Sequence, residues 1–158
     1  MVNNVKYAGL IKNDVVNGEG ICVSLWTQGC PFRCPGCHNP ETWSFEDGID
    51  VPNDLKGQIV KAISNNGITR NFSVLGGEPL CVPNLAFVED IVTAVRSAYP
   101  NIKIYIWTGY EYEDIQDYSI LDKIDVLITG PFKIEERDIT LPLRGSKNQK
   151  VLRKGIDF

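Results

Sequence analysis

Short apolar runs alternate with longer amphipathic segments through most of the chain. The runs are rich in β-branched and aromatic residues and are bounded by Gly, Pro or Asp, which is typical of buried strands. The segments between the later runs have apolar residues at helical spacing. The predicted strands are ICVSLWT at 21–27, FSVL at 72–75, IKIYIWT at 102–108 and DVLIT at 125–129.

Two of the amphipathic segments have clear boundaries. The first helix is expected from Pro52 to about Asn66 and Gly67, a residue pair suited to a left-handed helix cap. The second is expected from Pro83 to the residue before Pro100, because proline cannot continue a helix. The residues predicted to face the core are Leu55, Ile59, Ala62 and Ile63 in the first helix, and Leu85, Val88, Ile91, Val92, Val95 and Tyr99 in the second.

A third, shorter helix is predicted over about 111–122, with Ile115 and Leu121 facing inward. Strands that alternate with helices indicate βαβ units, a mainly parallel sheet and right-handed crossovers. The fold class is therefore α/β, and the length of 158 residues fits a single domain over 1–158.

Each predicted strand ends in a loop that contains glycine. In parallel sheets and barrels, ligands bind beyond the carboxyl ends of the strands, on the loops that lead into the helices. We therefore expect these four loops to meet at one edge of the sheet. They are QGCPFRCPGC at 28–37, GGEP at 76–79, TGY at 108–110 and TGPF at 129–132.

Charge and composition exclude several classes of partner. The net charge is −4 without long runs of basic residues, so the chain lacks the basic surface that binding to a nucleic-acid backbone requires. The amino-terminal segment lacks the pattern of a signal peptide, and no stretch of about 18 apolar residues predicts a membrane span. We expect a cytoplasmic protein with no nucleic-acid or membrane partner. In that reducing compartment, five cysteines favour metal ligation, reactivity or burial over disulfides.

Cys30, Cys34 and Cys37 lie within eight positions of one another, in the pattern CxxxCxxC. Three thiolates in such a loop can each bind one iron of a 4Fe-4S cluster and leave the fourth iron open to another ligand. A structural zinc site would need a fourth donor from His38, Cys22 or Cys81, and the paired CxxC spacing of zinc knuckles is absent. A redox pair formed by Cys34 and Cys37 would not need Cys30. The spacing favours the open cluster.

These motifs resemble the radical S-adenosylmethionine superfamily, in which CxxxCxxC after a first strand is followed by a GGEP-type loop after a later one. Within it, the chain resembles the small anaerobic ribonucleotide reductase activating enzymes over nearly its whole length. Glu78 stands where the family often has Asp, His38 where it often has Tyr, and Leu143 where it usually has an aromatic residue. The matching blocks are VVNGEG (15–20), GCPFRCPGCHNPETW (29–43), GGEPL (76–80), IYIWTGY (104–110), DVLITGPF (125–132) and LRGSKNQ (143–149).

The resemblance implies two cofactors: a 4Fe-4S cluster and S-adenosylmethionine bound at its open iron. It also implies a chemistry, in which a reduced cluster cleaves S-adenosylmethionine and a hydrogen atom is removed from a glycine near the C-terminus of the large reductase subunit. An electron donor such as flavodoxin or ferredoxin would reduce the cluster. The implied metal ligands are Cys30, Cys34 and Cys37, and the implied cofactor-binding residues are Gly36, Cys37, His38, Gly76, Gly77 and Glu78.

The resemblance also implies specific roles and a shape. Gly76 and Gly77 would let the backbone approach the methionine end of the cofactor, and Glu78 would offer a carboxylate to its ammonium group. A complete β/α barrel takes about 250 residues, so we expect a partial, open barrel of the radical S-adenosylmethionine type. Its lateral opening could admit a loop of a protein substrate.

Several assignments stay open at this point. Activation of another glycyl radical enzyme, of the formate-lyase type, and a non-enzymatic metal-binding or redox module are the alternative functions. Cys22, Cys81, Trp26 and Trp107 are assigned to the core. Residues 144–149 could bind a cofactor or partner through Arg144, Ser146 and Asn148, or could close a C-terminal turn. The candidates for packing against adenine are Phe32, Trp43 and Tyr110.

Overall fold

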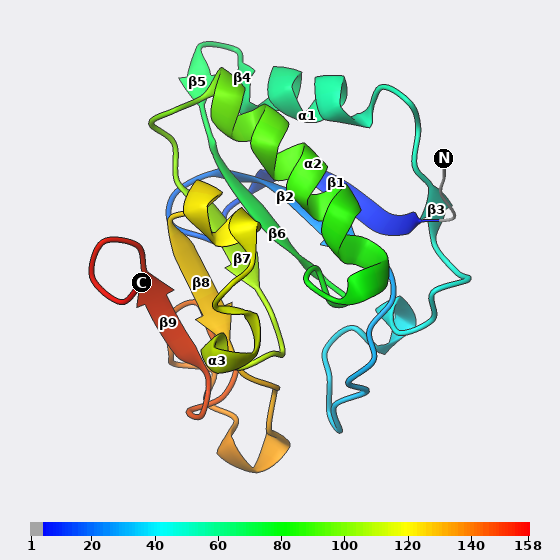
Figure 1. Ribbon diagram of the computed structural model, residues 1–158, viewed down its shortest axis with the longest axis vertical. Coiled ribbons are helices and arrows are strands. Elements are labelled where there is room, and N and C mark those ends of the chain that lie inside the picture. The colour runs from blue at the N-terminus through cyan, green and yellow to red at the C-terminus, as the bar shows by residue number, and fades with distance from the viewer. Residues whose placement is uncertain (1–4) are drawn as a thin grey trace.

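A mixed seven-stranded sheet forms the centre of the protein in the computed structural model, which describes residues 5–158 (Figure 1). Its strand order is β3-β1-β2-β6-β7-β8-β9, and β2, β6, β7 and β8 run parallel. These four are the predicted strands, which confirms the α/β class. The strands are β1 Lys6–Asp14, β2 Cys22–Thr27, β3 Ile49–Asp50, β6 Asn71–Gly76, β7 Ile104–Trp107, β8 Val126–Thr129 and β9 Lys150–Arg153.

Three antiparallel strands at the sides of the sheet were not predicted. β1 pairs with β2, β3 pairs with β1, and β9 pairs with β8. β1 carries Lys6, Lys12 and Asp14 and is only partly buried along most of its length, so it lacks the continuous apolar run of a central strand. Through residues 5–158 the pairings run from β3 at one edge to β9 at the other without closing into a barrel.

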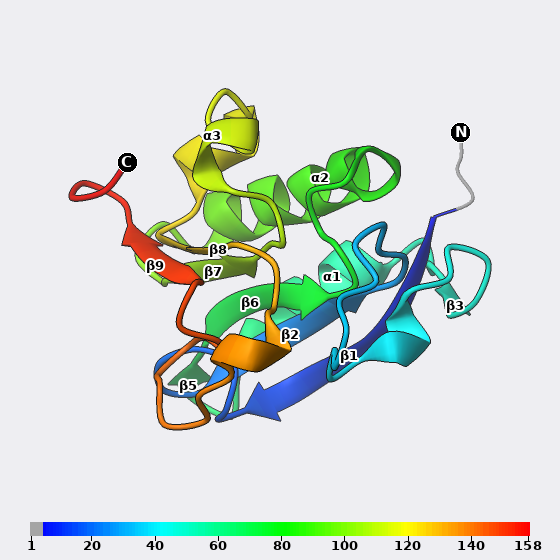
Figure 2. The same cartoon turned by 90° about the horizontal axis from the view of Figure 1, so that it is seen from below.

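The α-helices lie on one face of the sheet (Figures 1 and 2). The two long ones are α1 Leu55–Ile63 and α2 Val82–Ala98, and they pack with one set of alternating strand residues that includes Leu25, Val74 and Ile106. The opposite face has a smaller cluster of Cys22, Tyr105, Val126 and Ile128. Cys22 is fully buried, and Cys81 near the start of α2 is 2% exposed, so both are core residues as predicted.

The predicted end of the first helix is wrong. α1 stops at Ile63, and Asn66 and Gly67 instead form the two-residue turn between the short strands β4 Ser64–Asn65 and β5 Ile68–Thr69. Both turn residues have positive φ, 56° and 73°. Asn-Gly is the sequence that such a hairpin turn favours, because both of its central positions need the left-handed conformation.

The predicted third helix is two short pieces. α3 covers Tyr112–Ile115, and the 3-10 helix η2 covers Ser119–Lys123. The chain is extended at Tyr118 between them, where φ is −71° and ψ is 129°. Ile115 and Leu121 are both buried, so the inward face was predicted correctly although the helix is interrupted. Two further 3-10 helices, η1 Pro40–Thr42 and η3 Ile134–Glu136, lie in loops. In residues 5–158, no helix has both the length and the apolar character needed to cross a membrane.

Candidate active site

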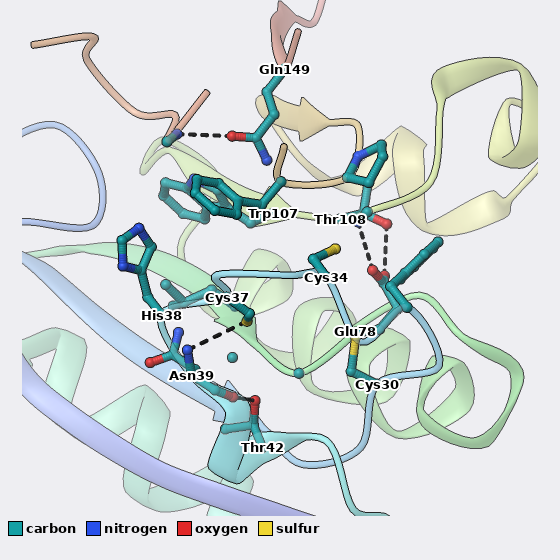
Figure 3. A pocket seen from close by; sticks show the side chains of 18 of the residues that line it. Cys30, Cys34, Cys37, His38, Asn39, Thr42, Glu78, Trp107, Thr108 and Gln149 are labelled. Carbon is teal, nitrogen blue, oxygen red and sulfur yellow. Dashed lines mark hydrogen bonds between the residues drawn. The ribbon is translucent and has the colours of Figure 1, made fainter. Parts of the chain in front are cut away.

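A cavity of about 540 Å³ lies beyond the carboxyl ends of β2, β6, β7 and β8 (Figure 3). Its volume falls in the range of about 300–1,000 Å³ that is usual for small-molecule sites. Each of the four loops predicted to converge contributes residues to its lining, and residues 141–149 form a further part of the wall. The predicted site residues that line it are Cys30, Cys34, Cys37, His38, Gly76, Gly77 and Glu78.

Gly36 is the one predicted site residue that is not part of this lining. It lies against Ile134, and a side chain built at Gly36 would overlap the end of that isoleucine. His38 is exposed at the cavity, with its ring 5.2 Å from the ring of Phe132. The structure therefore brings together the cysteines and the GGEP loop, and places Gly36 in the outer turn of the cysteine loop.

The three cysteines are free thiols, and each is partly buried. The backbone of Cys30 is held in place by a hydrogen bond, which its N–H donates to the Trp43 carbonyl at 3.1 Å. Cys37 donates its N–H to the Cys34 carbonyl at 3.0 Å, and its Sγ accepts a 3.4 Å hydrogen bond from the Asn39 N–H. Burial raises the pKa of Cys30 and of Cys34, so both are thiols in the metal-free protein. Binding of iron would therefore release protons.

The arrangement fits a cluster, whose ligands bind different metal atoms. Within residues 5–158, no three His, Cys, Asp or Glu side chains converge on a point that one metal ion could occupy. A single zinc ion needs four donors at about 2.0–2.3 Å from one centre. In a cubane, each thiolate binds its own iron, so the three sulfurs need only surround a common space. Figure 3 shows Cys30, Cys34 and Cys37 around the same cavity.

The two glycines of the GGEP loop are required by the close approach of β2 and the loop that follows it. A Cβ atom at Gly76 would lie 2.6 Å from the Thr27 nitrogen and 2.7 Å from its carbonyl oxygen. At Gly77 it would lie 2.9 Å from the Gly29 carbonyl carbon and closer still to the oxygen. Real Cβ atoms essentially never come this close to non-bonded backbone atoms. Both glycines line the cavity, but their lack of a side chain also lets the GGEP loop pack directly on the cysteine loop.

Glu78 connects the GGEP loop to the loop after β7 (Figure 3). Its side chain is 1% exposed. Its Oε1 accepts a 2.7 Å hydrogen bond from the Gly109 N–H, and its Oε2 accepts bonds from the Thr108 hydroxyl at 2.7 Å and the Leu80 N–H at 2.9 Å. Burial raises the pKa of Glu78 to about 7, and the three hydrogen bonds oppose that rise. Sequence reasoning identified Glu78 but not the pairing with Thr108 and Gly109.

We expect the stability of the iron-free protein to depend on pH through Glu78. The folded pKa of about 7 lies above the unfolded value of about 4.3, so the folded state binds this proton more tightly. The resulting stability is fully present below pH 4.3 and is lost as pH rises through 7, by about 4 kcal/mol in total. Urea unfolding of wild type and Glu78→Gln across pH 4–8 measures it. The difference in unfolding free energy between the two proteins should change over this window; a constant difference would contradict the assignment.

Aromatic side chains form much of the remaining lining. Phe32 and Trp43 line the cavity, whereas Tyr110 packs edge-on against Phe32 with 4.9 Å between ring centroids. Trp26 and Trp107, assigned to packing from the sequence, also line it. In the described part of the chain, the indole Nε1 atoms of Trp26 and Trp43 are buried without a hydrogen-bond partner. The site therefore offers more aromatic surfaces than the sequence indicated.

Residues 144–149 form a hydrogen-bonded turn that leads into β9, which is one of their two predicted roles; the other, binding of a cofactor or partner, stays a prediction. The Gln149 side chain accepts bonds from the Gly145 N–H at 2.8 Å and the Ser146 N–H at 3.1 Å, and donates to the Gly130 carbonyl at 3.0 Å. Asn148 donates to the Pro131 carbonyl at 2.7 Å. Trp107 fixes the same wall through a 2.7 Å bond from its Nε1 to the Leu143 carbonyl. Gln149 lines the cavity and was not singled out from the sequence, because its bond to Gly130 joins two loops that lie 19 positions apart in the chain.

Comparison with known proteins agrees with an iron–sulfur site in this cavity. Residues 16–152 match the family described as a 4Fe-4S single cluster domain. The chain is 34% identical to the anaerobic ribonucleoside-triphosphate reductase-activating protein of Pasteurella multocida, with 94% of this chain and 98% of the relative covered. It is 36% identical to the protein of that name in Vibrio cholerae (89% and 92% covered) and 34% identical to that of Escherichia coli strain K12 (87% and 92% covered).

These likenesses extend over nearly the whole chain and include every loop that lines the cavity. They are therefore not confined to the cysteine motif. The chain belongs to the family of anaerobic ribonucleoside-triphosphate reductase-activating proteins.

Proposed function

We propose that this protein activates an anaerobic ribonucleoside-triphosphate reductase by forming a glycyl radical on its large subunit. The observation that carries the proposal is the single cavity that joins the three free cysteines to the GGEP loop. Family membership supports the reductase as the partner, because the relatives are named for activating it. The protein would act in the cytoplasm, as a radical S-adenosylmethionine enzyme built on a partial barrel.

When bound, the cluster would supply one electron, received from a flavodoxin or ferredoxin, for reductive cleavage of S-adenosylmethionine, and the glycine of the reductase would give up one hydrogen atom. The products are methionine, deoxyadenosine and the glycyl radical. The protein's own residues bind and orient the reactants and exclude competing reactions. Cys30, Cys34 and Cys37 would hold the cluster, and the GGEP loop beside Cys30 would hold the methionine end of the cofactor.

The hydrogen bonds of Glu78 define which of its atoms can contact the cofactor. A carboxylate has about four acceptor positions, two on each oxygen. Oε2 already accepts two hydrogen bonds, whereas Oε1 accepts one, from Gly109. Oε1 thus retains one position for the ammonium group of S-adenosylmethionine. Such a charge-assisted bond would also favour the ionised form of this buried carboxyl.

The open side of the sheet supports the proposal that the substrate is a protein. Through residues 5–158 the sheet has free edges at β3 and β9, and the α-helices lie on one face only. A cavity bounded by loops at the end of such a sheet is accessible to a segment of another protein. A small substrate would instead be expected to be enclosed on most of its surface.

The proposal is tested by following both products in one anaerobic reaction. The iron-loaded protein, reductant and S-adenosylmethionine are incubated with the full-length reductase, or with a variant whose C-terminal glycine is replaced by alanine. We expect a glycyl radical signal in electron paramagnetic resonance with the intact reductase only, together with formation of deoxyadenosine. Equal radical signals from both reductases would contradict the proposal. So would the absence of a signal from the intact reductase while S-adenosylmethionine is cleaved. A signal on a formate-lyase type enzyme alone would favour the other activase function.

A further inference from the structure

A buried amide on the first turn of α2 contacts both loops that form the proposed cluster and cofactor sites. Asn84 is 2% exposed. Its Nδ2 lies 3.0 Å from the carbonyl oxygen of Gln28, 3.0 Å from that of Glu78 and 3.4 Å from that of Gly29. The two hydrogens of the amide can serve the two shorter contacts at once. One side chain therefore joins the residues just before Cys30 to the GGEP loop.

The backbone around Cys30 is held more firmly than the backbone around the other two cysteines. The Glu78 N–H donates to the Gly29 carbonyl at 2.8 Å, and the Cys30 N–H donates to the Trp43 carbonyl at 3.1 Å. By contrast, the backbone hydrogen bond at Cys34 and Cys37 joins these two to each other. Any force that Asn84 exerts on the cysteine loop is thus transmitted to Cys30, the ligand next to the GGEP loop.

Asn84 also occupies a position where packing alone would favour an apolar residue. It lies four residues before Val88 and seven before Ile91, on the buried face of α2. A polar side chain on such a face is costly unless its hydrogen bonds are satisfied. Here they are satisfied by carbonyl groups of the site itself. The amide is also the donor that these buried carbonyl groups would lose if Asn84 were replaced.

We infer that Asn84 is a positioning residue that fixes Cys30 relative to Glu78, and thereby the cluster relative to S-adenosylmethionine. The inference rests on the proposed function of the cavity. Asn84 does not line the cavity and does not touch the cofactor; it acts through the Gln28, Gly29 and Glu78 carbonyls. Loss of Asn84 should therefore change the position of S-adenosylmethionine relative to the cluster, while the same three cysteines still bind the iron.

The test uses iron-loaded protein and three substitutions of graded donor capacity. Asn84→Ala removes the amide, Asn84→Asp keeps its shape without the N–H donors, and Asn84→Ser keeps a shorter donor. The measurements are iron content, the dissociation constant of S-adenosylmethionine, and the change that S-adenosylmethionine causes in the electron paramagnetic resonance spectrum of the reduced cluster. For Asn84→Ala and Asn84→Asp we expect about tenfold weaker binding of S-adenosylmethionine and a reduced spectral change per cluster. Asn84→Ser should give values between those of these two variants and those of wild type.

Val95→Ala on the same helix is the matched control for a loss of stability. Val95 is 1% exposed and packs in the core away from the cavity, so this variant should unfold at a lower temperature yet bind S-adenosylmethionine as wild type does. Equal affinity and an equal spectral change in wild type and all Asn84 variants would overturn the inference while the proposed function stands. If wild type itself neither binds S-adenosylmethionine nor shows a spectral change, the proposed function and this inference fall together.

Discussion

Replacing Cys30, Cys34 or Cys37 by alanine is expected to abolish assembly of the iron–sulfur cluster. These three thiols are partly exposed and line one cavity, and a cubane with one open iron needs all three ligands. Iron and sulfide analysis after anaerobic reconstitution, together with the visible absorption of the cluster, gives the answer. We expect each variant to retain less than about a tenth of the wild-type iron, because removal of one ligand exposes a second iron.

Cys22→Ala and Cys81→Ala are the controls for this result. Both side chains are buried in the core outside the cavity lining, and burial raises the pKa of Cys81 to about 12. They should bind iron as wild type does, with a modest loss of stability from the smaller side chain. If Cys22→Ala lost its iron while Cys30→Ala kept it, the assignment of ligands would be wrong.

Gly77→Val is expected to damage the cluster site and the S-adenosylmethionine site together. The sequence alone predicts that Gly77→Val weakens S-adenosylmethionine binding and leaves the cluster intact, because it gives Gly77 a role only at the methionine end of the cofactor. In the structure, a Cβ at Gly77 overlaps the backbone of Gly29, the neighbour of Cys30. The GGEP loop and the cysteine loop must therefore separate, at a cost of about 3 kcal/mol in unfolding free energy. Iron content and S-adenosylmethionine affinity should both fall.

Gly57→Ala is the matched control for Gly77→Val. Gly57 lies inside α1, and a Cβ there meets no atom within 4 Å. Alanine at this position should raise the unfolding free energy by roughly 0.5–1 kcal/mol and leave iron content and cofactor affinity unchanged. If Gly77→Val kept full iron and lost only affinity for S-adenosylmethionine, the contact between the two loops would matter less than the packing indicates.

The parallel strands and the loops at their ends were predictable from the sequence because each of these strands is a short, mostly apolar run that is buried on both faces. Val23 and Leu25 on one face of β2 and Cys22 on the other are all fully buried. β1 and β9 were missed because their stability comes from pairing with distant strands, which local residue patterns do not report. The Asn66–Gly67 pair was assigned the correct backbone conformation but the wrong element, since positive φ serves both helix caps and hairpin turns.

In the site, sequence reasoning found the residues of its motifs but not the residues that hold them. Thr108 and Gly109 bond to Glu78 across 30 and 31 positions of the chain, and no local pattern specifies such a pairing. Asn84 was detectable in principle, because it interrupts the apolar stripe of α2 that continues through Val88 and Ile91. A polar residue on a buried helical face needs a partner, and this one finds it in the backbone of the site.

The cavity is assembled from segments that lie far apart in the chain, and this determines when a cluster can be inserted during biosynthesis. Its walls include Val16 near one end, Trp107 in β7 and Gln149 just before β9. When a growing chain has left the ribosome only as far as Cys37, its three thiols are present. The GGEP loop and the part of the wall that Gln149 holds by hydrogen bonds are still missing. Contacts of this sequence separation form late in folding. We therefore expect iron–sulfur loading to follow release of the chain from the ribosome, and we expect the three thiols to be exposed to oxidation and to other metals until then.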